Sequence, residues 1–155
     1  MESIKKGGRQ LTRDIAVVIK KKLRDLEQNL IYLKEISEDI SLENLKTDMV
    51  RYWGIERGIQ ISIENIIDIA NIIISVSGQE KPDTYRDIML KMSELDVVTV
   101  TFAKRLANMA GFRNILVHDY TKIEPQVILK ILEEGINDFT QYAREVYKWM
   151  ETNDY

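Results

Sequence analysis

The sequence predicts an all-α protein, an antiparallel bundle of four or five helices. Apolar residues recur at intervals of three and four through most of the 155 residues, which is the period of a helix buried along one side. Only seven glycines and two prolines are present, and both prolines fall at boundaries between apolar segments. A chain of this length that is 45% hydrophobic can bury one substantial core. We therefore expect one helical-bundle domain over residues 11–155 and an N-terminal extension over residues 1–10.

The first two expected helices are long. Leucine, isoleucine and valine spaced at three and four predict a helix over residues 11–40, and Ser41 is a typical N-cap for a second helix over residues 42–77. The isoleucine-rich residues 59–76 also suit a strand, because β-branched side chains favour sheets. Helix is the better interpretation, since the polar residues inside this run recur at the spacing of one helical stripe: Gln60, Glu64, Asp68, Asn71 and Ser75.

Three further helices are expected in the second half of the chain. Pro82 lies in the one turn-rich connection, after which Asp83 or Thr84 is expected to cap a third helix that runs to residue 95. Asp96 is expected to cap a fourth helix that reaches about residue 117. Pro125 suits the first turn of a fifth helix over residues 125–150.

Composition excludes most kinds of site chemistry. With no cysteine and one histidine, a single chain has no disulfide, thiol nucleophile, zinc finger or multi-histidine metal site. We expect no cofactor. The net charge of −3 requires any polyanionic partner to meet a local cationic patch. No secretory signal is visible, and residues 59–76 carry too many polar side chains for a typical membrane span. We therefore expect a soluble cytoplasmic protein that does not bind membranes.

The most informative segment is Gly111-Phe-Arg-Asn-Ile-Leu-Val-His-Asp-Tyr120. At about 100° per residue, Arg113 and Tyr120 fall within about 20° of Phe102, inside an apolar helical stripe, while Asn114 and His118 stack on a second line. An arginine in such a stripe needs a partner, a cleft or another subunit. A purely structural alternative is that Arg113 extends its charge to water and His118 interacts with the end of the helix dipole.

Arg113-Asn-Ile-Leu-Val-His118-Asp-Tyr120 resembles the Arg-x-x-x-x-His-x-Tyr motif of HEPN-domain proteins, in particular the HepT-like toxins. The likeness extends over residues 11–150. It implies an all-α bundle that forms a homodimer with both motifs lining a shared cleft. It also implies metal-independent cleavage of RNA and a minimal nucleotidyltransferase antitoxin of the MntA type, which adenylylates the motif tyrosine, Tyr120.

These residue types suit RNA cleavage without a metal. Imidazole titrates near neutral pH, so His118 can move protons, and the guanidinium of Arg113 matches phosphate oxygens. Asn114 is expected to orient the histidine or donate to a phosphate, and Tyr120 to contact a base or a phosphate. One histidine does not easily serve as both base and acid, which a second copy in a dimer would solve. Additional positive charge is expected from nearby cations on this part of the chain, Lys104, Arg105 and Lys122. The alternative for Lys104 and Arg105 is a solvated helix face.

Several interpretations remain open from the sequence. The chain is either this enzyme, a non-catalytic HEPN module that binds nucleotide or protein, or a helical interaction protein whose dimer surface contains Arg113. The stripe of residues 60–75 is either a solvent face or part of the cleft, with Glu64 or Asp68 pairing Arg113. Residues 1–10 are a basic arm, a cloning remnant or a misassigned start.

Overall fold

The computed structural model describes residues 2–118 and 123–155, with side chains over residues 7–117 and 123–155. Within these ranges the chain forms helices and no strand, which confirms the predicted all-α class. The elements in order are α1 (Glu2–Ile36), α2 (Leu42–Thr47), α3 (Met49–Val76), α4 (Tyr85–Glu94), α5 (Val100–His118), α6 (Pro125–Lys130), the π-helical segment η1 (Ile131–Gly135) and α7 (Ile136–Thr152).

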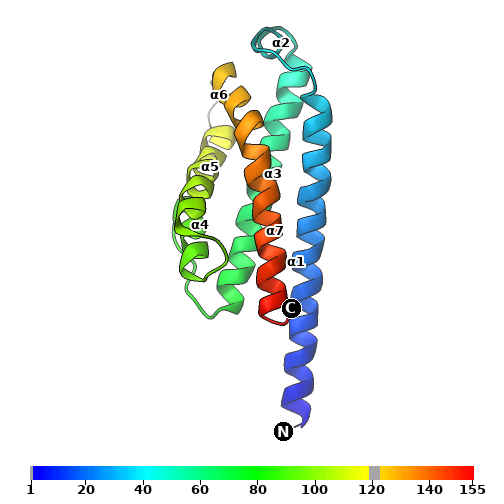
Figure 1. Ribbon diagram of the computed structural model, residues 1–155, viewed down its shortest axis with the longest axis vertical. Helices are drawn as coiled ribbons and strands as arrows, with labels where there is room; N and C mark the ends of the chain where they lie inside the picture. The colour runs from blue at the N-terminus through cyan, green and yellow to red at the C-terminus, as the bar shows by residue number, and fades with distance from the viewer. Residues whose placement is uncertain (1, 119–122) are drawn as a thin grey trace.

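Helix α3 is the central element of the bundle. It packs against α1, α4, α5 and α7 (Figure 1). Its buried isoleucines fill the core. By length and composition α3 could cross a membrane, so composition alone does not exclude a span as the sequence reasoning assumed. The buried side chains of α3 make it the core helix of this bundle, and the strand interpretation of residues 59–76 is wrong.

The second predicted helix is interrupted at Asp48. Ser41 caps α2 as expected, in a capping box in which its side chain and that of Asn44 each accept from the other residue's backbone N–H. Asp48 then leaves the helical conformation (φ −97°, ψ 87°), and its carboxylate accepts from the backbone N–H of Arg51 to begin α3. Aspartate is favoured at helix starts because it satisfies free N–H groups there. Residues 42–76 therefore form two helices, α2 and α3, where one helix was expected.

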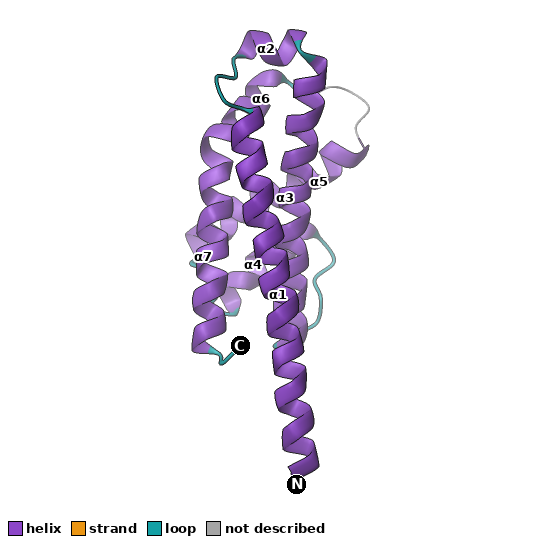
Figure 2. Cartoon of the chain, turned by 90° about the vertical axis from the view of Figure 1, so that its right-hand side faces the viewer, coloured by secondary structure: helices purple, strands orange, loops and turns teal. Residues whose placement is uncertain are grey.

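Helix α1 differs from its prediction at both ends. It stops at Ile36 instead of residue 40, and Asp39 adopts a left-handed backbone with φ 55° in the turn to α2. At the other end the backbone is already helical at Glu2, so residues 2–10 continue α1, and the first turns project past the rest of the bundle (Figure 2).

The remaining helices follow the prediction with two corrections. Thr84 caps α4 by accepting from the N–H of Asp87, as expected. Asp96 does not cap the next helix: it has φ 57°, and Thr99 accepts from the N–H of Phe102 to begin α5. The predicted fifth helix is continuous in direction but contains the π-helical turn η1 between α6 and α7.

Candidate functional site

Arg113 is held between two other helices. Its Nε lies 3.6 Å from Oε1 of Glu64 on α3, and its guanidinium carbon lies 5.2 Å from the ring centre of Tyr85 on α4. The arginine side chain is 25% exposed and that of Glu64 is 34% exposed. An ion pair and a cation–π contact together offset the cost of drawing this charge partly out of water.

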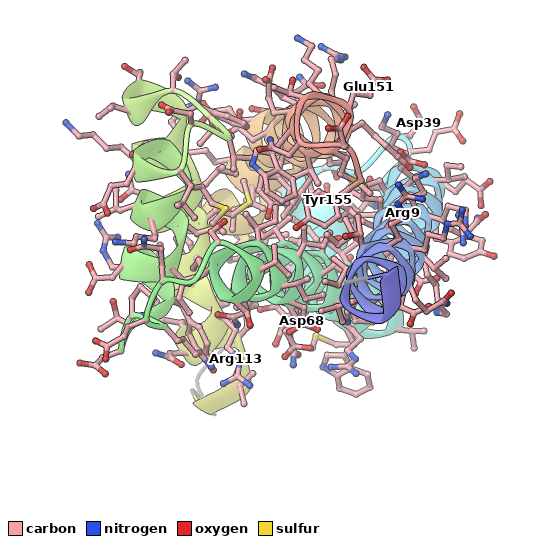
Figure 3. All side chains as sticks on the ribbon, turned by 90° about the horizontal axis from the view of Figure 1, so that it is seen from below. Arg9, Asp39, Asp68, Arg113, Glu151 and Tyr155 are labelled. Carbon is pink, nitrogen blue, oxygen red and sulfur yellow. The ribbon has the colours of Figure 1, made fainter. Side chains whose placement is uncertain are left out.

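The stripe on α3 contributes to this site. Gln60 Nε2 donates to Glu64 Oε1 at 3.1 Å, which fixes the carboxylate that faces Arg113. Asp68 instead pairs with Lys22 of α1, with its Oδ2 3.3 Å from Nζ. Of the two carboxylates considered for Arg113, Glu64 is therefore the partner. Figure 3 shows Arg113 and Asp68 on the same side of the molecule.

The other predicted site residues are described only in part. Asn114 follows Arg113 on α5 and is exposed. His118 is the last residue of α5, so its backbone lies one helical turn beyond Asn114, in agreement with the expected end of the helix. The side chain of His118 lies outside the described residues, as do Tyr120 and Lys122.

The expected contribution of Arg105 to this cationic site is wrong. Its guanidinium pairs with Asp138 of α7, Nη2 to Oδ1 at 3.2 Å, and lies over the ring of Phe102. This places the charge against α7 rather than beside Glu64. Lys104 is exposed and remains a solvated cation.

Two positions that support the site were missed from the sequence. Tyr85, at the first turn of α4, packs its ring against Arg113. Tyr52 of α3 is buried and donates its hydroxyl hydrogen to the carbonyl of Ile123 at 3.2 Å, which ties the chain after the motif to α3. Aromatic side chains at helical spacing indicate a core, and nothing in their spacing distinguishes the few that touch a functional residue.

Electrostatically, the arrangement suits an anion. Arg113 is a cation on an otherwise apolar face of α5, partly shielded from water, with an acid that an incoming phosphate can replace. Among the described residues no group of three or more histidine, cysteine or carboxylate side chains is placed to hold a metal ion.

The sequence pattern of the ribonuclease HepT-like family matches residues 15–146, most of this bundle and all of the segment around Arg113. The chain belongs to the HepT-like ribonuclease family. This confirms the resemblance noted in the sequence, and it identifies the protein as an RNA-cleaving enzyme.

Relatives of this HepT-like chain include two nucleases. The tRNA nuclease HepT of Aphanizomenon flos-aquae is 26% identical over 136 residues, which is 88% of this chain and 92% of that protein. The mRNA nuclease HepT of Shewanella oneidensis is 25% identical over 125 residues, covering 81% and 92% respectively. The chain thus spans nearly the whole length of these relatives.

A solved structure has the same architecture. The tri-AMPylated Shewanella oneidensis HEPN toxin, in complex with MNT antitoxin, superimposes with a TM-score of 0.77 at 24% identity. The alignment covers 84% of this HepT-like chain and 97% of that toxin. It shows that the two share the fold.

Proposed function

We propose that this HepT-like protein is the toxin of a cytoplasmic toxin–antitoxin pair and cleaves RNA without a metal ion, in a cleft between two copies of the chain. The observation that carries the proposal is the partly buried Arg113, held by Glu64 and Tyr85 about one and a half turns before the end of α5, where His118 lies. The nuclease activities named for its relatives support the same assignment.

In this mechanism the 2′-hydroxyl of one nucleotide attacks the adjacent phosphorus. The bond from O2′ to phosphorus forms, the bond from phosphorus to O5′ breaks, and the products are a 2′,3′-cyclic phosphate and a 5′-hydroxyl. His118 accepts the 2′-hydroxyl proton, and the same histidine of a second copy donates a proton to the leaving O5′. Arg113 exchanges Glu64 for the phosphate and stabilises its developing charge.

The proposed antitoxin is a minimal nucleotidyltransferase that adenylylates Tyr120. The phenol oxygen would attack the α-phosphorus of ATP, pyrophosphate would leave, and the phenol proton would pass to solvent or a base. The adduct would add bulk and negative charge to a motif that binds phosphate, and both exclude RNA. The related Shewanella toxin is AMPylated and bound to MNT antitoxin, which supports this kind of regulation here.

Cleavage of RNA in excess chelator tests the catalytic proposal. Arg113→Ala and His118→Ala are expected to lose cleavage while keeping the helical circular dichroism of the wild type. Arg105→Ala is the matched control, because Arg105 is on the same helix but pairs with Asp138. Full cleavage by a folded Arg113→Ala or His118→Ala variant contradicts the mechanism. A folded wild type that binds RNA without cutting it favours the non-catalytic binding module.

A further inference from the structure

Trp53 and Arg57 extend the stripe of residues 60–75 on α3 towards the N-terminus of the helix. They precede Gln60 and Glu64 at the same spacing of three and four, so all four residues share one face of the helix. A tryptophan on this line is unexpected, because the core side of α3 is available to an apolar residue. The side chain of Trp53 nevertheless remains 61% exposed.

These two residues lie at the end of the bundle where the motif lies. Helices α3 and α5 run in opposite directions, so residues that precede Glu64 on α3 are level with those that follow Arg113 on α5 (Figure 1). The hydrogen bond from the Tyr52 hydroxyl to the carbonyl of Ile123, just after the motif, confirms that the first turns of α3 lie beside the chain that follows α5. At 1.5 Å per residue, Arg57 lies roughly 10 Å and Trp53 roughly 16 Å from Glu64 along the helix axis.

No hydrogen bond or ion pair with a described residue uses the polar groups of this pair. Arg57 is exposed, and its guanidinium has no ion pair or hydrogen bond with any described residue. Arg51, two turns earlier on α3, shows the contrast, since its guanidinium donates to the carbonyls of Ile36 and Glu38. The guanidinium of Arg51 therefore joins α3 to the end of α1, and the structure gives Arg57 no such role.

A groove between α1 and α3 runs beside Arg57. Its lining includes Gly54 and Gly58, against which α1 packs closely, together with Tyr32, Glu35 and Arg57, while Trp53 lies outside the groove on the other side of Arg57. The groove measures about 550 Å³, and Tyr32 is 59% exposed. An exposed aromatic ring, an unpaired guanidinium and a second aromatic across a groove are the groups with which proteins hold single-stranded RNA.

We propose that Trp53 and Arg57 form an RNA subsite, in which Trp53 stacks on an unpaired base and Arg57 pairs with a phosphate beside the cleaved bond. The inference rests on the proposed function, since it assigns the substrate class as single-stranded RNA and the direction in which the strand leaves Arg113. A free cation favours a phosphate backbone over an apolar protein surface at this position.

Tryptophan fluorescence tests the subsite without requiring catalysis. The chain has two tryptophans, and Trp149 is 9% exposed and stacked on Tyr155 with ring centres 5.2 Å apart. In a Trp149→Phe background the emission comes from Trp53 alone. Titration with a short single-stranded 2′-O-methyl oligonucleotide, which lacks the attacking hydroxyl, is expected to quench this emission to saturation. The same sequence as a duplex is expected to quench weakly.

Variants then separate stacking from charge. Trp53→Ala is expected to weaken binding of the oligonucleotide, measured by anisotropy, roughly tenfold, and Trp53→Phe much less, because phenylalanine retains a stacking face. Arg57→Ala is expected to lower the slope of log affinity against log salt by about 0.7. Val100→Ala and Lys46→Ala, an exposed apolar residue and an exposed cation on other helices, are controls that should leave both values unchanged.

The outcomes distinguish this inference from the proposed function. Absence of quenching, or wild-type oligonucleotide affinity in Trp53→Ala and Arg57→Ala, overturns the subsite even where RNA is still cleaved. Loss of self-association in these variants by sedimentation, with oligonucleotide affinity intact, assigns the patch to a protein interface and also overturns it. Quenching with the expected losses supports the subsite, and it does so even where the wild type fails to cleave.

Discussion

The Nε of Arg113 lies 3.6 Å from Oε1 of Glu64, so the motif arginine of α5 is joined to a carboxylate of α3. A carboxylate beside an RNA site opposes the phosphate that must bind there. It also fixes the arginine, because Glu64 is itself held by Gln60. Under the proposed mechanism Glu64 has two opposing effects on cleavage, and a substitution that keeps its shape separates them.

Glu64→Gln is expected to lower KM for RNA and to lower kcat. KM falls roughly two- to fivefold because a repulsive charge is removed from a partly exposed site, where such pairs are weak. The value of kcat falls because Arg113 is held less firmly in the transition state. Asp68→Asn is the matched control, since Asp68 pairs with Lys22, and it should leave kcat unchanged. An unchanged kcat in Glu64→Gln shows that Glu64 does not position Arg113.

The helical period made most of the fold predictable. A run of isoleucines with polar residues every three or four positions specifies α3 directly, and the side chains of Ser41 and Thr84 mark helix starts because they satisfy free N–H groups. The break at Asp48 and the start at Thr99 were missed because several capping residues stand close together in the sequence. Tertiary packing selects among them, and that information is not local.

The candidate site was predictable in part. The helical period placed Arg113 on an apolar stripe and implied that it needs a partner, and Glu64 was one of two carboxylates considered. The choice between Glu64 and Asp68 depends on how α1, α3 and α5 rotate against one another, since Lys22 of α1 takes Asp68. Tyr85 comes from α4, whose position follows from long-range packing and not from any spacing in the chain.

Tyr120→Phe is expected to remain a ribonuclease that the antitoxin cannot modify. Removing one hydroxyl keeps the aromatic ring and the Arg113 site but removes the nucleophile for adenylyl transfer. Incubation with ATP and the partner nucleotidyltransferase, followed by intact-mass spectrometry, should show AMP on the wild type and none on the variant. Tyr85→Phe, in which another site tyrosine loses its hydroxyl, is the control and should still be modified. An AMP adduct on Tyr120→Phe excludes Tyr120 as the acceptor.

Gly58→Ala is expected to destabilise the bundle by about 1 kcal/mol. An added Cβ would stand 2.9 Å from Cδ1 of Leu33, which is buried in the core, and overpacking of this kind costs about 1–3 kcal/mol. The better helix propensity of alanine returns about 1 kcal/mol of this. Gly8→Ala is the control, because nothing lies within 4 Å of its added Cβ, and it should increase helix content. Urea unfolding measures the first effect and circular dichroism the second.

Alkaline pH is expected to destabilise the protein through two buried tyrosines. Tyr142 is fully buried and donates its hydroxyl hydrogen to the carbonyl of Ile66 at 2.9 Å, and burial raises its pKa above the ordinary value of 10.0. Burial also raises the pKa of Tyr52 to about 12. Because the folded state holds both protons more tightly than the unfolded chain, their contribution to stability is complete below pH 10 and is lost as the pH rises through the folded pKa values.

Denaturant unfolding at several pH values measures this contribution for each tyrosine. At pH 8, Tyr142→Phe is expected to be about 1 kcal/mol less stable than the wild type, because one buried hydrogen bond is lost. Above pH 10 the wild type alone must retain that phenolic proton to stay folded, so the difference between the two proteins should shrink by up to about 1.4 kcal/mol per pH unit. Tyr32→Phe, at an exposed position, is the control and should follow the wild type throughout. A stability difference between Tyr142→Phe and the wild type that stays constant from pH 8 to 11 would show that Tyr142 titrates alike in both states.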